Sequence, residues 1–388
     1  MSQSFEEISA QLKKRHRRSA RMKWMTMGAL ILSAAFLVLF ISDMVVRGWP
    51  AFQQAQLQVE VSYDEQSQEL PLAAVDEDVR PLISRGFFRS LPRAMENNPE
   101  LMGTTQTKWV IADSRVDQFL KGNEDRLRPA DKETLQALVE DGRAALKFNT
   151  TFFTTGDSKM PELAGIASAA IGTVMTMLVT MAVCFPIGVM TAVYLEEFAP
   201  DNRLTQLIEI NINNLAAVPS ILFGLLGLAI YISFFGVPRS SPLVGGLTLA
   251  LMTLPVIIIS TRAALRSVPD SIRHAAFGVG CSRWQVVRDH VLPVSLPGIL
   301  TGSIIGLAQA MGETAPLIIV GMVAFIPDAS ISITSASTVM PAQIFTWASE
   351  PNSAFAEKTA GGILVLLAVL IFLNALAVWL RNKFERRW

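Results

Sequence analysis

Long apolar runs alternate with polar stretches along the chain, and the runs have the length of membrane-spanning helices. The first run, residues 25–46, holds a single charged residue, Asp43. A helix needs about twenty apolar residues to cross a bilayer, and the apolar core of a signal peptide is shorter. We therefore predict a retained transmembrane helix there. Five further spans are predicted at residues 165–194, 212–235, 242–260, 295–325 and 361–380.

A polar segment, residues 47–162, separates the first span from the second. One stretch of it alternates apolar and polar residues, the apolar ones being Leu57, Val59, Val61 and Tyr63. A period of two predicts a half-buried strand. Residues 130–147 have helical spacing, and residues 148–155 are rich in strand-forming types. We therefore predict an all-α polytopic membrane protein of six transmembrane helices, with a small α+β domain between the first two that serves as a spacer or a partner-docking domain.

Charge is scarce and unevenly distributed. Charged residues make up 17% of the chain, against about 25% in an average globular domain. Arginine is concentrated in the connector at residues 261–293 and in the last residues, 381–388. Short connectors rich in Arg and Lys stay in the cytoplasm. We therefore expect a multi-pass protein of a bacterial inner membrane, with both termini in the cytoplasm and residues 47–162 outside it.

The pattern divides the chain into five parts. They are a basic cytoplasmic tail (1–24), a first transmembrane helix (25–46), an extracytoplasmic domain (47–162), a transmembrane domain (163–380) and a cytoplasmic tail (381–388). Within the transmembrane domain, residues 196–211 predict an amphipathic helix at the membrane surface, and Glu197 is expected to lie on the cytoplasmic surface. Cys184 and Cys281 stand in different settings, so we expect no disulfide, no metal and no cofactor.

The connector at residues 261–293 carries the signals of a helix, a turn and a second helix. Ser267 and Asp270 form an S-x-x-D capping box, which predicts a helix beginning at Val268. Gly280 is the natural left-handed residue at the end of that helix.

The second helix of the connector is expected to be short. Ser282 is a suitable cap for it, and Pro293 is expected to stop it. A hairpin of this kind can rest on lipid head groups as an amphipathic element. The small residues Ala275 and Ala276 favour the alternative, close packing against another protein.

Residues 274–293 resemble the EAA loop of ABC-importer permeases, whose pattern is E-A-A, three residues, G, nine residues and I-x-L-P. The matching positions are His274, Ala275, Ala276, Gly280, His290, Val291, Leu292 and Pro293. His274 replaces the acid of the pattern, and His290 replaces an apolar residue. The resemblance therefore implies a docking shape that does not depend on an acid at its first position.

Three further segments are similar to the PstA family, the permease subunits of phosphate importers. They read LAAVPSILFGLLGL (215–228), GCSRWQVVRDHVLPVSLPGILTG (280–302) and GETAPLIIVG (312–321). The similarity covers residues 165–380 and implies the fold of a type I ABC-importer permease. The insert at residues 47–162 is similar to the extracytoplasmic extension of long variants of this family.

The resemblance implies a subunit of an ATP-driven phosphate importer. A phosphate-binding protein would deliver phosphate outside, a PstC-like permease would complete the path, and two ATP-binding cassette subunits would act inside. Coupling to them would run through His274, Ala275, Ala276, Gly280, Arg283, Trp284, Leu292 and Pro293. The chain has no G-x-x-x-x-G-K-[ST] loop, so we expect hydrolysis in the partner subunits and no catalysis here. Phosphate and membrane lipid are the other expected contacts, and no nucleic acid is.

Four polar residues are candidates for the translocation path or for the interface between subunits: Gln309, Glu313, Thr314 and Arg262. A charge inside a membrane costs about 3 kcal/mol or more, so Glu313 needs a basic partner, a watery path or a proton. The family commonly has Arg where this chain has Gln309, and Arg262 is the nearest basic residue. Glu313 as a structural hydrogen-bonding group and Arg262 as a topology-determining residue are the alternatives.

Two other functions stay open at this point. The permease could carry another oxyanion, such as molybdate or sulfate. A membrane sensor would need a cytoplasmic output domain, and none of the predicted cytoplasmic segments is long enough to form one.

Overall fold

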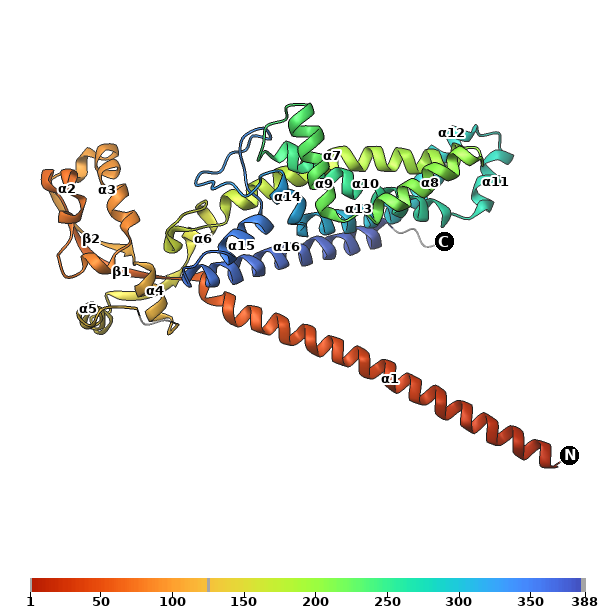
Figure 1. Cartoon of the computed structure of the whole chain (residues 1–388), viewed down its shortest axis with the longest axis horizontal. Coiled ribbons are helices and arrows are strands. Elements are labelled where there is room, and N and C mark those ends of the chain that lie inside the picture. The colour runs from red at the N-terminus through yellow and green to blue at the C-terminus, as the bar shows by residue number, and fades with distance from the viewer. Residues whose placement is uncertain (1, 124–125, 385–388) are drawn as a thin grey trace.

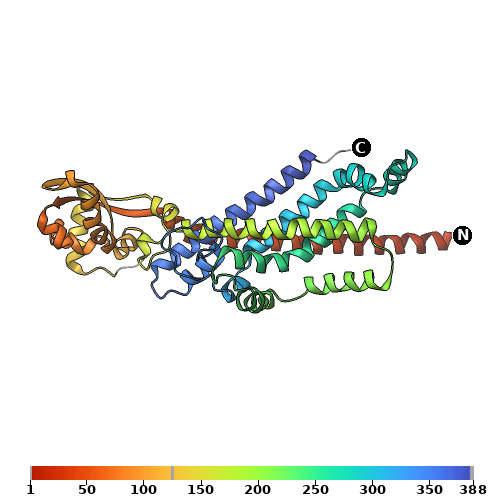
Figure 2. The same cartoon turned by 90° about the horizontal axis from the view of Figure 1, so that it is seen from above.

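A sheet domain and a long helical bundle lie at opposite ends of the molecule, and the first helix leaves the bundle at an angle (Figure 1). The computed structural model describes residues 2–123 and 126–384. The view from above shows the same separation, with the long helices running along the long axis of the molecule (Figure 2). The predicted division into a mainly helical membrane part and a small α+β part is confirmed.

The sheet domain is built on β1 (Gln53–Tyr63), which lies between β2 (Thr104–Ile111) and β3 (Ala144–Phe148). Both pairings are antiparallel. The predicted strand is confirmed, since its four apolar residues are buried in the core of the domain. The domain also contains the helices α2 (Glu65–Glu69), α3 (Arg85–Asn97), α4 (Ser114–Leu120) and α5 (Pro129–Glu140).

Two predictions for the end of this domain are wrong. Helix α5 stops at Glu140, and Gly142 turns the chain with a φ of +69°, so that residues 144–148 form β3 instead of continuing the helix. Strand β1 would otherwise present an unpaired edge on that side. The next stretch, predicted as a strand, forms the short helix α6 (Thr150–Thr154), because Asn149 caps its first turn.

Helices α7 to α16 form the bundle. Their bounds are α7 (Ala167–Val193), α8 (Arg203–Ala216), α9 (Ser220–Leu226), α10 (Pro242–Arg266), α11 (Asp270–Gly278), α12 (Arg283–Gln285), α13 (Leu292–Gly312), α14 (Ala315–Ile319), α15 (Met340–Ala348) and α16 (Ala354–Phe384). Five of the described helices are long and apolar enough to cross a membrane, and a bent pair would make a sixth span. The spans predicted at residues 165–194, 242–260 and 361–380 correspond to α7, α10 and α16.

The span predicted at residues 212–235 is the bent pair. Helix α8 occupies its first residues and ends at Ala216, and the chain turns by 105° into α9 and the π-helical residues 227–234. Pro219 stands in the break as an extended residue, and proline has no N–H to continue a helix. The amphipathic helix predicted within residues 196–211 is present as α8, which starts at Arg203.

Helix α10 is the centre of the bundle and packs against α7 and α13. In its most apolar window 56% of the residues are buried, compared with 0% for α1 and 6% for α16. Glycine makes the central packing close, since a Cβ on Gly246 would lie 2.5 Å from the Val179 Cβ. The bundle therefore has a dense centre and an apolar periphery, as expected where lipid or another subunit surrounds it.

Helix α1 (Ser2–Gly48) is continuous, so the predicted tail at residues 1–24 is helical from Ser2 onward. It meets α16 near its end, where Gly48 lies against Ala360 and Leu364, and it diverges from there (Figure 1). The tail predicted at residues 381–388 begins inside α16. Residues 385–388, like Met1, lie outside the described part of the chain.

A buried ion network fastens the sheet domain to the first turn of α16. The Lys121 Nζ lies 2.6 Å from both Asp117 Oδ2 and Glu357 Oε1, and Gln118 Nε2 donates to Glu357 Oε2 at 2.7 Å. Only 2% of the Lys121 side chain is exposed. Asp117 also accepts the N–H of Ala55 on β1, so one network joins the sheet, α4 and α16.

Candidate functional site

Helices α11 and α12 lie at the end of the bundle farthest from the sheet domain (Figures 1 and 2). They belong to the connector for which the sequence predicts a helix, a turn and a second helix. Helix α10 extends to Arg266, so the first residues of that connector continue α10 instead of leaving it. The polar connector is therefore shorter than predicted, and its two helices are held close under the end of the bundle.

The start of α11 differs from the prediction. Ser267 Oγ donates to the Ala264 carbonyl at 2.7 Å and does not cap a new helix. Pro269 is the extended residue that precedes the first turn. The helix therefore begins at Asp270 and not at Val268, because Ser267 closes the last turn of α10 and its side chain is directed back along that helix.

The turn and the second helix are partly as predicted. Gly280 has a φ of +87°, a left-handed conformation that glycine adopts at little cost. Ser282 caps α12, forming a capping box in which its N–H donates to Gln285 Oε1 at 2.8 Å. Pro293 does not stop the second helix. Residues 286–291 are π-helical and continue directly into α13, where Pro293 falls in the first turn and its missing N–H is tolerated.

The inner side of α11 packs against the end of the bundle. Ala276 is 4% exposed and belongs to a buried apolar cluster with Leu265 of α10. Its other buried members are Val193, Val268, Val286, Val287 and Val291. Leu292 packs against the same cluster. Its side chain therefore lies on the inner side of the hairpin and not on its outer surface.

The outer side of α11 and α12 is apolar and uncovered. Phe277, Val279 and Trp284 have exposed fractions of 48%, 81% and 54%. We call this side the α11 surface, and its exposed residues are His274, Ala275, Phe277, Gly278, Val279, Gly280, Arg283 and Trp284. A Cβ on either glycine would meet nothing within 4 Å. The surface therefore combines small residues with protruding apolar side chains, the combination that close packing against another protein needs. Pro293 is exposed too, but on α13.

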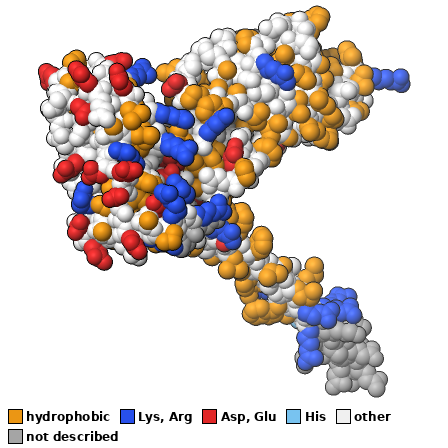
Figure 3. Space-filling view, turned by 60° about the vertical axis from the view of Figure 1, so that its left-hand side comes forward, with side chains coloured by type: hydrophobic (Ala, Val, Ile, Leu, Met, Phe, Trp, Pro, Cys, Tyr) orange, Lys and Arg blue, Asp and Glu red, His pale blue; other side chains and the backbone are white. Residues whose placement is uncertain are grey.

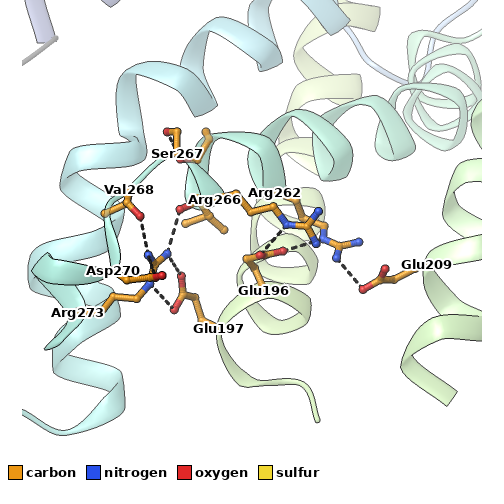
Figure 4. A network of polar contacts seen from close by, with 11 residues as sticks. Glu196, Glu197, Glu209, Arg262, Arg266, Ser267, Val268, Asp270 and Arg273 are labelled. Carbon is orange, nitrogen blue, oxygen red and sulfur yellow. Dashed lines mark hydrogen bonds and ion pairs between the residues drawn. The ribbon is translucent and has the colours of Figure 1, made fainter. Parts of the chain in front are cut away.

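Arg273 ties α11 to the end of α7 (Figure 4). Its Nη2 lies 2.8 Å from Glu197 Oε1 and also donates to the Leu265 carbonyl, while Nη1 donates to the Val268 carbonyl at 2.7 Å. Its side chain is 17% exposed. The hydrogen bond with Glu197 raises the pKa of Arg273. One guanidinium therefore holds α11 to the ends of two other helices, α7 and α10.

A second set of ion pairs joins α10 to α8 and to the end of α7 (Figure 4). Arg262 Nη2 lies 2.6 Å from Glu209 Oε1, and Arg262 Nε lies 3.2 Å from Glu196 Oε2. Arg266, one turn further along α10, reaches Glu196 Oε1 at 2.7 Å. Arg262 thus links three helical segments, and its side chain is 13% exposed. Its guanidinium is engaged by these two acids.

The acids of this network were missed by the sequence analysis. Glu197 was expected to lie on the cytoplasmic surface, but it is 9% exposed and paired with Arg273. Glu196 and Glu209 come from the stretch taken to be a surface helix. A signal was present, since Arg262 and Arg266 are four residues apart on one helical face and need acids opposite them.

A cavity of about 730 Å³ opens beside α11 and is lined by this network. Arg266, Arg273 and Arg283 line it together with Phe277, and Arg283 also lies over the ring of Phe198, 5.5 Å from its centroid. The α11 surface is therefore bordered by a recess with three guanidinium groups, and not by a flat membrane-facing side.

The path candidates lie at the other end of α13. The span predicted at residues 295–325 is present but ends earlier than predicted, because α13 ends at Gly312 and α14 starts at Ala315. Glu313 stands in the break as an extended, half-buried residue. Gln309 is exposed and Thr314 is half-buried. Among the described residues Glu313 has no side-chain hydrogen bond or ion pair, so its basic partner remains a prediction.

Arg262 is not close to Glu313. Helices α10 and α13 run antiparallel, and a Cβ on Gly298 would meet Ala264 whereas one on Gly306 would meet Thr253. Glu313 therefore lies several turns along α10 from Arg262. The structure groups Gln309, Glu313 and Thr314, and it assigns Arg262 to the ion network near α11.

Two family models match parts of this chain. The family model described as "Binding-protein-dependent transport system inner membrane component" matches residues 184–388. A second model, described as a domain of unknown function (DUF3333), matches residues 9–79 and 71–130. It reaches from the described part of α1 into the sheet domain.

Relatives and a solved structure are similar to part of this chain. "Phosphate transport system permease protein PstA 1" of Mycobacterium tuberculosis is 30% identical over 224 residues, which are 58% of this chain and 72% of that protein. PstA of Yersinia pestis is 30% identical over 55% of this chain and 71% of its own length. The inward-facing MetNI methionine ABC transporter is 16% identical, with a TM-score of 0.44 over 57% of this chain and 96% of that chain.

The size of these matches decides the family. The family model covers more than half of the chain, and relatives at 30% identity are covered over more than two thirds of their length. The chain belongs to the inner membrane components of binding-protein-dependent transport systems, the permeases of ABC importers.

Proposed function

We propose that the chain is the transmembrane permease subunit of an ATP-driven importer of inorganic phosphate. The substrate is supported by the relatives, since the proteins from Mycobacterium tuberculosis and Yersinia pestis are named phosphate transport system permeases. Most of their length is matched by this chain. Molybdate or sulfate remains the alternative cargo, and the competition experiment below separates the three anions.

The observation that carries the proposal is the α11 surface. Phe277, Val279 and Trp284 are exposed at the tip of the bundle. The packing of the membrane-spanning helices does not require apolar side chains at this place. An ATP-binding cassette subunit that covers them would gain about 25 cal/mol for each Å² of apolar surface buried. Hydrolysis then belongs to that partner, and this subunit passes on the motion without catalysing a reaction.

The ion network gives the motion a route into the membrane. Arg273 connects α11 to the end of α7 through Glu197. Arg262 connects α10 to α8 through Glu209, and Arg266 connects α10 to the end of α7 through Glu196. A displacement of α11 therefore acts on the end of α7 and on α8, in addition to its neighbours in the chain. In this proposal α11 moves as a rigid body. Arg273 on α11 and Arg262 and Arg266 on α10 transmit that motion to the neighbouring helices.

The path itself is proposed to need a second permease. Glu313 has no basic partner in the described part of this chain, and α1 and α16 present apolar side chains to the outside. A PstC-like subunit would cover one of these faces, and membrane lipid would cover the other. In this arrangement Gln309, Glu313 and Thr314 lie at the interface or along the path.

The proposed orientation puts α11 and both termini in the cytoplasm. The arginines of the connector are at the same end of the molecule as the start of α1 and the end of α16 (Figure 1), and such segments stay inside. The sheet domain, residues 47–162, is then extracytoplasmic, on the side where a phosphate-binding protein would deliver its cargo.

Uptake by a reconstituted transporter tests this function. The chain is placed in vesicles with its partner permease, two ATP-binding cassette subunits and the binding protein, and radioactive phosphate uptake is measured with and without ATP. We expect uptake only with ATP and only with the complete set. Absence of ATP-dependent uptake from a complete, folded set would reject the proposal.

Competition decides the cargo. Excess unlabelled phosphate should abolish uptake of the label, whereas equal concentrations of molybdate or sulfate should leave most of it. If molybdate or sulfate competed more strongly than phosphate, that anion would be the substrate. The proposed importer mechanism would be unaffected.

A further inference from the structure

A basic cavity lies where the sheet domain meets the bundle. It measures about 470 Å³ and is lined by Arg85, Arg115 and Arg126 of the sheet domain, with residues 351–354 of the bundle on its other side. Asp113 is the acid in its lining. Lys and Arg side chains gather at this junction, whereas Asp and Glu are frequent over the rest of the domain (Figure 3). The junction is therefore the basic side of a domain that is otherwise rich in acids.

The acid of the cavity is already occupied. Asp113 Oδ1 accepts the Arg115 N–H at 3.0 Å, which caps α4, and it also accepts from Arg115 Nε at 2.8 Å. Arg85 makes no side-chain hydrogen bond or ion pair with any other described residue. A guanidinium has five N–H donors, so Arg85 and the far side of Arg115 keep donors directed at whatever fills the cavity.

The row of arginines on α3 extends the basic side beyond the cavity. Arg85, Arg89 and Arg93 follow each other at a spacing of four residues, which places them on one helical face, and all three are exposed. Like charges at this spacing destabilise a helix. The arrangement therefore costs stability in the free chain, and a bound anion would relieve that cost.

A second cavity relates the basic cavity to the membrane. It measures about 410 Å³, shares Gln118 and Ser353 with the first, and is lined on its other side by Val46 and Arg47 of α1 and by Glu357 of α16. Since α1 and α16 are both apolar enough to span a membrane, their junction marks the level of the membrane surface. The basic cavity opens just beside that level.

We propose that this cavity binds a phosphate group. The planar fork of arginine matches the oxygens of phosphate with paired hydrogen bonds, which a lysine ammonium cannot provide. Arg85 and Arg115 are the binding residues, and Arg89 and Arg93 attract the anion along α3. Two sources share this chemistry: inorganic phosphate gathered outside the bundle, and the head group of an anionic lipid at the membrane surface. The first source rests on the proposed function, and the second does not.

Direct binding to the whole chain tests the site without the other subunits. The protein is placed in nanodiscs of phosphatidylcholine, and binding of radioactive inorganic phosphate is followed by equilibrium dialysis. The double variant Arg85→Ala with Arg115→Ala should weaken binding on the order of a hundredfold, about tenfold for each charge-assisted pair. The matched control, Arg89→Ala with Arg93→Ala, removes the same charge from the same basic side outside the cavity and should weaken binding only a few-fold.

Nanodiscs that contain phosphatidylglycerol provide the second arm. If the lipid is the source, phosphatidylglycerol raises the thermal midpoint of the wild type and is retained in native mass spectrometry, and both effects are lost in Arg85→Ala with Arg115→Ala. Saturable binding in either arm that depends on these two residues supports the site. Absence of binding in both arms, or equal losses in the test and control variants, overturns it.

The test is independent of transport. Phosphate binding without uptake by a complete transporter would reject the proposed function and leave the site. Uptake by the complete transporter without phosphate or lipid binding in either arm would support the proposed function and reject the site.

Discussion

The two ends of the bundle are joined to polar structure by ion pairs of different character. At the sheet domain, Lys121 is 2% exposed and Glu357 is 6% exposed. At the opposite end, Arg273 is 17% exposed and Arg266 is 60% exposed, and a cavity of about 730 Å³ opens beside them. The pair at the sheet domain is almost fully shielded from solvent, although Glu357 also lines the cavity of about 410 Å³ beside α1, whereas the arginines at the opposite end are partly exposed.

This difference teaches which joint can move. Breaking a buried pair leaves a charge without water or partner, so a dry network has one arrangement. A half-exposed arginine loses less when it changes partners, because water replaces what it leaves. We infer that the sheet domain is fixed to α16, whereas α11 is held by contacts that can be exchanged during a transport cycle.

The substitution Lys121→Met should have the largest effect. It removes the ammonium that Asp117 and Glu357 both contact at 2.6 Å, and the loss of such a buried pair costs about 3–5 kcal/mol. The sheet domain should come loose from α16. Thermal unfolding of the full chain in detergent, with limited proteolysis between the domain and the bundle, measures both effects.

A matched control is Arg115→Met, which breaks a pair that is 42% and 15% exposed. Its cost should stay within about 1 kcal/mol. If Lys121→Met were as mild as this control, the joint at the sheet domain would not be the dry one, and the comparison between the two ends would fail.

Arg273→Met should have an intermediate effect. It removes the hydrogen bonds to Glu197 and to two carbonyls at the end of α10, at a cost of about 2 kcal/mol. The chain should still assemble with its partners, since the α11 surface is unchanged, but ATP hydrolysis should no longer depend on the binding protein. Basal and stimulated ATPase rates of the reconstituted transporter show this.

The control for Arg273 is Arg288→Met, in which an exposed pair with the neighbouring Asp289 is lost. Its ATPase rates should equal those of the wild type. A variant at Arg273 that kept normal stimulation would mean that α11 transmits motion through the chain alone, without the ion network.

Gly280→Trp tests the α11 surface itself. Both Trp and Ala at this position must adopt a φ of +87°, which costs roughly 1–2 kcal/mol, but only Trp adds bulk to the surface. Stimulated ATPase activity should fall about tenfold in Gly280→Trp, corresponding to 1.4 kcal/mol of docking energy, and much less in Gly280→Ala. Equal losses would assign the defect to backbone strain and would count against docking at this surface.

The sequence was sufficient for the features that depend on local patterns. Apolar length predicted the spans at α7, α10 and α16, period-two alternation predicted β1, and glycine conformation predicted the turn at Gly280. These features are determined by residues that are close together in the chain, so they can be predicted from a single sequence. The loop pattern at residues 274–293 also led to the surface that the structure leaves uncovered.

The failures concern residues whose conformation is decided by distant contacts. Ser267 reads as a cap, but α10 continues through it. Residues 144–148 read as helix, but they complete the edge of β1, which begins some ninety residues earlier. The acids Glu196 and Glu197 read as surface residues, because nothing local shows that arginines of α10 and α11 face them.

Glu162→Gln should have the smallest effect, visible only through pH. Burial raises the pKa of the Glu162 carboxyl, whose Oε1 accepts from Ser84 Oγ at 2.7 Å and whose Oε2 has no hydrogen-bond partner among the described residues. Between the pKa of the unfolded chain, about 4.3, and the raised native value, the native state holds more protons. Its stability is therefore greatest below this window and falls as the pH rises through it.

The amide of Glu162→Gln cannot ionise, so the difference in thermal midpoint between variant and wild type should grow in favour of the variant from pH 5 to pH 8. The exposed Glu100→Gln should show no such trend. A midpoint difference that is constant with pH would mean that water reaches Glu162. In that case the contact between Ser84 and Glu162 would be solvated like the ion pairs near α11, and the attachment of the sheet domain to α16 would rest on the network of Lys121 and Glu357.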